Sequence, residues 1–140
     1  MNVRRLVALA GLAVVLAAPP LAAQQLRQME VERVVLLSRH GVRAPTETNA
    51  ELDKQVATPF PAWSVAPGGL TPRGAELMRL MGDFYRIIYS GRGLISPERC
   101  PHPGITAAYA DVDPGTRASA QALLEGLLPR CKVAADHQAA

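Results

Sequence analysis

The sequence lacks a hydrophobic run long enough to cross a membrane. The apolar stretch Leu6–Ala18 follows two arginines and stops at Pro19-Pro20, short of the roughly 20 residues that a transmembrane helix needs. Small residues follow at Leu21–Ala23, and this order of features is typical of a secretory signal peptide. We therefore expect residues 1–23 to be cleaved, and the mature chain, residues 24–140, to be periplasmic or secreted with no stable membrane anchor.

An excess of positive charge is also lacking once this leader is removed. The leader carries two arginines and no acidic residue, so the formal net charge falls from +3 to +1. No run of like charge, internal repeat or low-complexity tract occurs, and we expect no nucleic-acid partner. Arginine outnumbers lysine in the mature chain, and its planar fork of donors suits a carboxylate or phosphate. A high-GC coding bias explains the same preference, so an anionic ligand is one of two interpretations.

Cysteine is limited to Cys100 and Cys131. The sequence contains neither a Cys-x-x-Cys motif nor a cluster of cysteines and histidines, so we expect no structural zinc site. An even number of cysteines in an exported chain favours a disulfide. The loop that it closes spans about 31 residues, and such closure typically stabilises a fold by about 2–4 kcal/mol. The alternative is a pair of buried free thiols.

The first predicted element is a strand over residues 31–38. This segment is β-branched and apolar at its centre, which is typical of a strand buried on both faces inside a parallel sheet. Gly41 and Pro45 end the strand. Residues 46–69 contain three prolines and the single tryptophan, and they are predicted to form a loop of unusual length.

Two helices are predicted, and each has a clear start. Thr71–Pro72 supplies an N-cap and a first helical residue, and apolar residues recur at helical spacing over residues 77–88 before the helix ends at Gly91. A second strand, residues 106–112, leads to a similar start at Asp113–Pro114. No element is predicted after the second helix. The order strand, loop, helix, strand, helix predicts an α/β fold, with a partial parallel sheet and flanking helices.

The candidate chemistry lies where the predicted strands end, because ligands of open α/β sheets gather beyond the carboxyl ends of the strands. The first strand leads directly into Arg39, His40 and Arg43, and the second leads into a helix that carries Arg117 in its first turn. If the strands are neighbours, three guanidinium groups converge beside one imidazole, and a helix N-terminus adds its preference for an anion. Such a pocket suits a tetrahedral dianion.

The reaction that this pocket suits is cleavage of a phosphate monoester. Arginines offset the charge of the phosphate oxygens without a metal. Neutral imidazole is a competent nucleophile near or below pH 7 and forms a covalent phosphohistidine that water hydrolyses. The leaving alcohol also needs a proton from a general acid. No residue between positions 24 and 140 is an obvious donor.

The stretch Ser38–Thr46, Ser-Arg-His-Gly-Val-Arg-Ala-Pro-Thr, resembles the Arg-His-Gly-x-Arg-x-Pro signature of the histidine acid phosphatases. This family includes bacterial periplasmic phytases and glucose-1-phosphatases. The resemblance implies that His40 is the nucleophile, that Arg39 and Arg43 bind phosphate, and that Thr46 contacts substrate. It implies no metal or other cofactor.

The resemblance extends over most of the mature chain. Leu70–Gly74 is similar to the start of a family helix, and Ala110–Asp113 with Thr116-Arg117 is similar to the segment that supplies a further phosphate-binding arginine. Cys100 and Cys131 fall where bacterial members carry a disulfide. Pairing of Arg117 with Asp111 or Asp113 is the structural alternative to phosphate binding. His102 and His137 have no motif around them and are expected to be exposed loop residues.

The resemblance also implies that residues 24–140 are only the N-terminal portion of the phosphatase domain. The later His-Asp or His-Ala-Glu element that protonates the leaving group has no counterpart, and most of the helical cap domain is missing. We expect an acid phosphomonoesterase that acts on phytate, a sugar phosphate or another small monoester. Pro114-Gly115 stands where charged residues are common in phytases, which leaves the substrate open. The alternatives are a truncated phosphate-binding fragment without turnover and a secreted interaction module.

Overall fold

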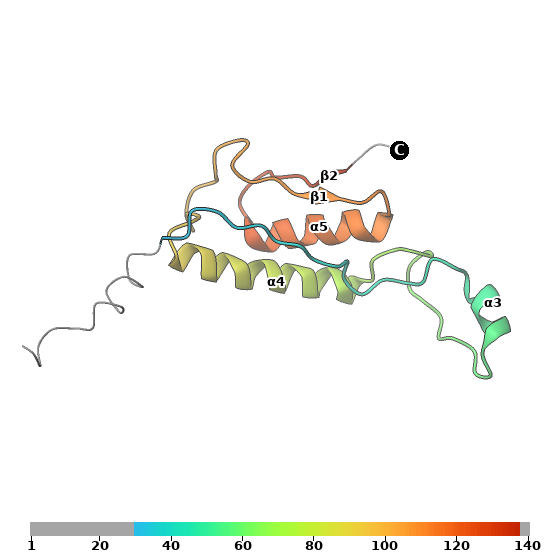
Figure 1. Cartoon of the computed structure of the whole chain (residues 1–140). Coiled ribbons are helices and arrows are strands. Elements are labelled where there is room, and N and C mark those ends of the chain that lie inside the picture. The colour runs from blue at the N-terminus through green and yellow to red at the C-terminus, as the bar shows by residue number, and fades with distance from the viewer. Residues whose placement is uncertain (1–29, 138–140) are drawn as a thin grey trace, which may run out of the picture. The chain divides into compact units, whose positions relative to one another are not determined.

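The computed structural model describes residues 30–137, and the predicted signal peptide lies outside them. The helices and strands within this described range belong to a compact unit that begins at Arg33. In chain order they are α3 (Asn49–Leu52), the 3-10 turn η1 (Asp53–Gln55), α4 (Pro72–Gly91), β1 (Tyr109–Ala110), α5 (Pro114–Leu127) and β2 (Asp136–His137) (Figure 1). None of the described helices is long and apolar enough to span a bilayer.

Helices α4 and α5 lie side by side and form the core (Figure 1). Met78 of α4 packs against Ala122 and Leu123 of α5. About one turn further along both helices, a Cβ atom on Gly82 would clash with the Leu123 carbonyl oxygen, and one on Gly126 would clash with the backbone of α4. The two backbones therefore touch where both side chains are missing. Because the contacts advance in the same direction along both helices, α4 and α5 are parallel and begin at the same end.

Both helices begin where the sequence predicts. The hydroxyl of Thr71 accepts a hydrogen bond from the Gly74 N–H at 3.0 Å, and Pro72 is the first residue of α4. Asp113 precedes α5, but its carboxylate makes no capping hydrogen bond. Instead its carbonyl oxygen accepts from the N–H groups of Thr116 and Arg117. The starts of α4 and α5 are thus correct, and only the first has the side-chain cap expected of an N-cap residue.

The predicted α/β class is confirmed. Strands β1 and β2 form a small parallel sheet, and α5 is the connection between them. Tyr109 of β1 pairs with Asp136 of β2, and Ala110 pairs with His137. The strand predicted over residues 106–112 is therefore shorter than expected. The element β2 was not predicted at all, because two residues are too few for a pattern of alternating apolar side chains.

The predicted strand over residues 31–38 is wrong for this chain. The structure assigns it no strand, and the side chains of Val35 and Leu37 are 89% and 99% exposed. A strand of the expected kind needs a neighbour whose N–H and C=O groups complete its ladder. The sheet of the described residues consists of β1 and β2, and neither pairs with this segment. Its β-branched, apolar residues favour a strand only where neighbouring strands and a covering layer are present. The described residues provide neither for this segment.

The predicted loop over residues 46–69 also contains one short helix, α3. The Thr48 backbone N–H and hydroxyl both donate to one carboxylate oxygen of Glu51, at 2.9 and 2.8 Å. This arrangement is part of a capping box, which satisfies donors that the first turn of a helix leaves free. The same hydrogen bonds hold the pKa of the Glu51 carboxyl below its usual value of 4.5. The Thr-x-x-Glu spacing was the signal for this helix, although Pro59, Pro61 and Pro67 favour a loop.

Candidate functional site

The loop after Arg39 is bound by backbone hydrogen bonds to the start of α4. The carbonyl oxygen of Val42 accepts from both the N–H and the hydroxyl of Thr71, at 2.9 and 2.8 Å. The Ala44 N–H donates to the Gly69 carbonyl oxygen at 2.9 Å. Ala44 is buried, in contrast to the exposed segment that precedes the loop. The residue that caps α4 therefore also anchors the loop.

Glycine residues allow this close approach of the loop to both helices. A Cβ atom on Gly74, in the first turn of α4, would clash with the Val42 carbonyl oxygen. A Cβ atom on Gly115, in the first turn of α5, would clash with the Gly68 carbonyl oxygen and lie 2.8 Å from Cδ of Arg43. The loop thus lies against both helix starts at points where no side chain intervenes.

A buried serine of α5 holds the residue that follows His40. The Gly41 N–H donates to Ser119 Oγ at 2.9 Å, and the Ser119 hydroxyl donates to the Gly115 carbonyl oxygen at 2.6 Å. Ser119 is only 2% exposed. Sequence reasoning did not single out this residue. A hydroxyl on the apolar face of α5, one turn after Gly115, was the signal that could have identified it.

The hydrogen bonds of His40 define one tautomer of its imidazole. Nδ1 lies 2.8 Å from the Gly41 carbonyl oxygen, which can only accept, so Nδ1 carries the proton. Nε2 then has a free lone pair, and it accepts a hydrogen bond from Nε of Arg43 at 3.0 Å. The tautomer is inferred from these two partners, which agree with each other. The ring is half-buried, and its lone pair lies on Nε2.

Arg43 is the predicted arginine that the structure brings to His40. Besides its bond to the imidazole, its Nη1 donates to the Ala44 carbonyl oxygen at 3.1 Å. The other two predicted arginines, Arg39 and Arg117, have exposed side chains. Among the residues that the structure describes, neither side chain makes a hydrogen bond or an ion pair. The alternative in which Arg117 pairs with a neighbouring aspartate is therefore not found.

Arg117 nevertheless lies at the same end of α5 as the His40 loop. Its backbone N–H bonds to the Asp113 carbonyl oxygen in the first turn, two residues before Ser119. Thr46 follows the buried Ala44 by two positions. Its side chain is exposed, and its hydroxyl donates to Glu47 at 3.3 Å. The structure thus brings His40 and Arg43 together beside the start of α5. It pairs the Thr46 hydroxyl with the carboxylate of Glu47.

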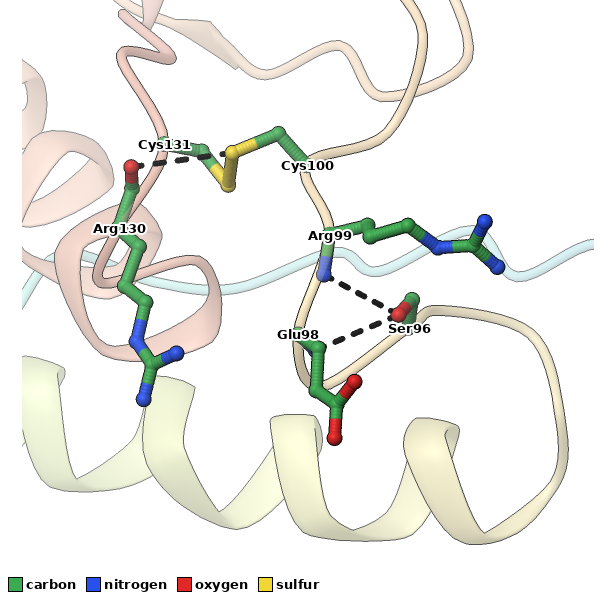
Figure 2. The surroundings of a disulfide bond; sticks show 6 residues. All are labelled: Ser96, Glu98, Arg99, Cys100, Arg130 and Cys131. Carbon is green, nitrogen blue, oxygen red and sulfur yellow. Dashed lines mark hydrogen bonds between the residues drawn. A yellow bond between two sulfur atoms is a disulfide. The ribbon is translucent and has the colours of Figure 1, made fainter.

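The predicted disulfide between Cys100 and Cys131 is present, with a Cα–Cα distance of 5.5 Å (Figure 2). It joins the segment between α4 and β1 to the segment after α5. Sγ of Cys100 lies 3.7 Å from the Arg130 carbonyl oxygen, and the backbone N–H groups of Glu98 and Arg99 donate to the Ser96 hydroxyl (Figure 2). A shallow pocket lies beside this disulfide and not beside His40. In the described part of the chain, no histidine, cysteine or acidic residues cluster in a way that could hold a metal ion.

Comparison with known proteins gives consistent matches over the same part of the chain. The model of the histidine phosphatase superfamily (branch 2) matches residues 30–140. Phytase AppA of Escherichia coli is 39% identical over 117 residues, which cover 84% of this chain and 27% of the phytase. Glucose-1-phosphatase of Salmonella typhimurium is 37% identical over 111 residues, which cover 78% of this chain and 27% of that protein.

A solved structure shows the same similarity in three dimensions. The phytase of Hafnia alvei, in complex with myo-inositol hexakis sulphate, has a TM-score of 0.70 and 44% sequence identity. The superposition covers 78% of this chain and 27% of the phytase. The chain thus spans about a quarter of the length of the relatives that it matches.

Proposed function

Because the chain belongs to the histidine phosphatase superfamily (branch 2), we propose that His40 accepts the phosphoryl group of a phosphate monoester. The observation that carries this proposal is the hydrogen bonding of the imidazole. Nδ1 donates to Gly41, and Nε2 keeps a lone pair. That is the protonation state in which a histidine is a nucleophile at Nε2.

The reaction proceeds in two steps. The Nε2 lone pair of His40 attacks phosphorus, an Nε2–P bond forms, and the P–O bond to the alcohol breaks. Water then attacks the phosphohistidine, the N–P bond breaks, and inorganic phosphate leaves with His40 regenerated. A direct attack by water on the phosphate dianion is thus replaced by two easier steps that pass through a covalent intermediate.

Arg43 links substrate binding to release of the nucleophile. Its Nε donates to His40 Nε2 at 3.0 Å in the free chain. A phosphate dianion is a stronger acceptor for a guanidinium than a neutral imidazole, because its negative charge attracts the cation and its oxygens can accept two parallel hydrogen bonds from the guanidinium fork. Phosphate therefore draws Arg43 away from the ring and exposes the lone pair of Nε2 for attack.

Arg39 and Arg117 complete the proposed phosphate site. Their guanidinium groups have no partner among the described residues, so binding an anion breaks no existing ion pair. Guanidinium groups aimed at the phosphate oxygens supply the positive charge that the reaction needs. The starts of α4 and α5, at the same end of the helix pair, also favour an anion there. We assign Thr46 to a contact with the organic part of the substrate.

The proposed substrate class is a small phosphorylated metabolite such as phytate or a sugar phosphate. The relatives named above are a phytase and a glucose-1-phosphatase. Export to the periplasm or outside the cell accords with the predicted leader. The disulfide supports this location as well, because such bonds persist mainly in oxidising compartments.

A second function, phosphate binding without turnover, is favoured by the surroundings of His40. Its hydrogen-bond partners in the described part of the chain are Gly41 and Arg43, and no carboxyl group is among them. A leaving alkoxide needs a proton from a general acid. p-Nitrophenolate does not, so if His40 is the nucleophile, p-nitrophenyl phosphate should still phosphorylate the 140-residue chain even where an alkyl phosphate fails. If the chain only binds phosphate, neither substrate should react.

Trapping of the phosphoenzyme tests the proposal. We expect the chain to take up labelled phosphate from p-nitrophenyl phosphate, in a bond that is stable in alkali and lost in acid. His40→Ala should remove the label. His102→Ala, which changes an exposed histidine, is the matched control and should retain it. Label that persists in His40→Ala contradicts the nucleophile, and phosphate binding without any label supports the second function.

A further inference from the structure

We infer that Ser119 is a positioning residue that holds the His40 imidazole in the tautomer needed for attack, an inference that rests on the proposed function of His40. Ser119 touches neither the imidazole nor Arg43 through a hydrogen bond. It acts through Gly41, which is 78 positions away in the sequence and 2.9 Å away in space. The hydroxyl is buried, so water does not compete for this bond.

The polarity of the serine hydroxyl is defined by its two partners. The Gly115 carbonyl oxygen can only accept, so Ser119 gives it the single hydroxyl proton, at 2.6 Å. The oxygen of Ser119 is then available only as an acceptor, and it receives the Gly41 N–H. A serine that bonds to the carbonyl one turn earlier is common in helices. The bond to a residue outside the helix is the feature that requires an explanation.

Gly41 connects Ser119 to the imidazole, because each of its two backbone polar groups bonds to one of them. Its N–H is held by Ser119, and its carbonyl oxygen accepts the proton of His40 Nδ1 at 2.8 Å. If Gly41 turns, the acceptor for Nδ1 moves and the proton can reside on Nε2 instead. The proton would then block the atom that attacks phosphorus.

Gly41 has no side chain of its own that could fix its orientation by packing. A Cβ atom there would lie 2.9 Å from Met78 Cγ and 3.0 Å from Leu70 Cδ1, so the position admits only glycine without local adjustment. Glycine has the widest conformational freedom of any residue. A residue of this kind next to the nucleophile needs a hydrogen bond to fix it, and Ser119 supplies that bond.

The tautomer of His40 can be measured directly in the 140-residue chain. The chain has three histidines, so long-range proton–nitrogen NMR spectra can be assigned with single His→Ala variants. Above the pH at which the ring is protonated, we expect the wild-type chain and Ser119→Thr to show His40 with the proton on Nδ1. Ser119→Ala should show both tautomers, and its rate of phosphohistidine formation should fall by up to about 100-fold.

Ser90→Ala is the matched control. Ser90 lies in α4, and its buried hydroxyl has no hydrogen-bond partner in the described part of the chain. This variant should leave the His40 tautomer and the rate unchanged. If Ser119→Ala does not fold, Ser119→Cys replaces it, because a thiol keeps the volume and is only a weak acceptor.

The outcomes separate this inference from the proposed function. A folded Ser119→Ala or Ser119→Cys chain that keeps the proton on Nδ1 overturns the positioning role, even if wild-type His40 is phosphorylated. A mixture of tautomers in these variants supports the positioning role, even if the wild-type chain never forms a phosphohistidine. In that last case only the proposed function fails.

Discussion

Two segments that are adjacent in the sequence have opposite environments in this protein. Residues 34–37 are apolar, and Val35 and Leu37 are almost fully exposed. Residues 41–44 follow after Arg39 and His40, and they are hydrogen-bonded to α5 and to the N-cap of α4. His40 stands between the two segments. Its orientation is therefore determined by the helices after it and not by the apolar segment before it.

The two segments differ in exposure because they need different hydrogen-bond partners. The loop needs single donors and acceptors, and Thr71 and Ser119 supply them from α4 and α5. An extended segment needs a whole neighbouring strand to complete its ladder. The described residues contain only the two-residue strands β1 and β2, which pair with each other.

The largest expected effect contrasts one leucine from the exposed segment with one from the core. Leu124 of α5 is 3% exposed, and Leu37 is 99% exposed. Leu124→Ala should lower the free energy of unfolding by about 2–5 kcal/mol, because it removes buried contacts and leaves a cavity. Leu37→Ala should change it by less than about 0.5 kcal/mol. Urea unfolding measures both, and an equal loss in the two variants would show that residues 33–38 are packed in solution.

A smaller effect should come from filling the contact between the loop and α4. Gly74→Ala places a methyl group against the Val42 carbonyl oxygen, and overpacking of this kind typically costs about 1–3 kcal/mol. Gly91→Ala is the matched control in the same helix, since nothing lies within 4 Å of its Cβ position. It should leave the urea midpoint unchanged or raise it slightly. Equal stability of Gly74→Ala and wild type would mean that the loop is not held against α4.

The smallest effect concerns the capping bonds at the start of α3. The Thr48 donors keep the pKa of Glu51 below 4.5 in the folded chain. A lowered folded-state pKa means that the carboxylate stabilises α3 at neutral pH, and that this contribution is lost as the pH falls below about 4.5 through the lowered pKa. NMR amide shifts of residues 48–52 should change in that range while those of α4 and α5 do not. Glu51→Gln, which cannot ionise, should remove the pH dependence, and a transition that remains in this variant would assign it to another group.

The accuracy of the sequence predictions follows the range of the interactions involved. The start of α4 was predicted correctly because Thr71 and Pro72 act within one turn of the helix. The disulfide was predicted correctly because only two cysteines exist. The strand over residues 31–38 was predicted from its composition, and composition does not supply a pairing partner. Ser119 was overlooked because a hydroxyl on the apolar face of α5 does not reveal its partner, and Gly41 is 78 positions away in the sequence.

The amino-acid sequence by itself determined the Arg-His-Gly-Val-Arg motif, the helix starts and the pairing of the cysteines. These features depend on the identity of residues and on bonds between near neighbours. Tertiary structure alone decided that a serine of α5 bonds to the residue after His40, and that Val35 and Leu37 face solvent. The first outcome depends on the backbones of α4 and α5 coming together, which the close packing at Gly82 and Gly126 allows. The second follows because no strand among the described residues pairs with the segment.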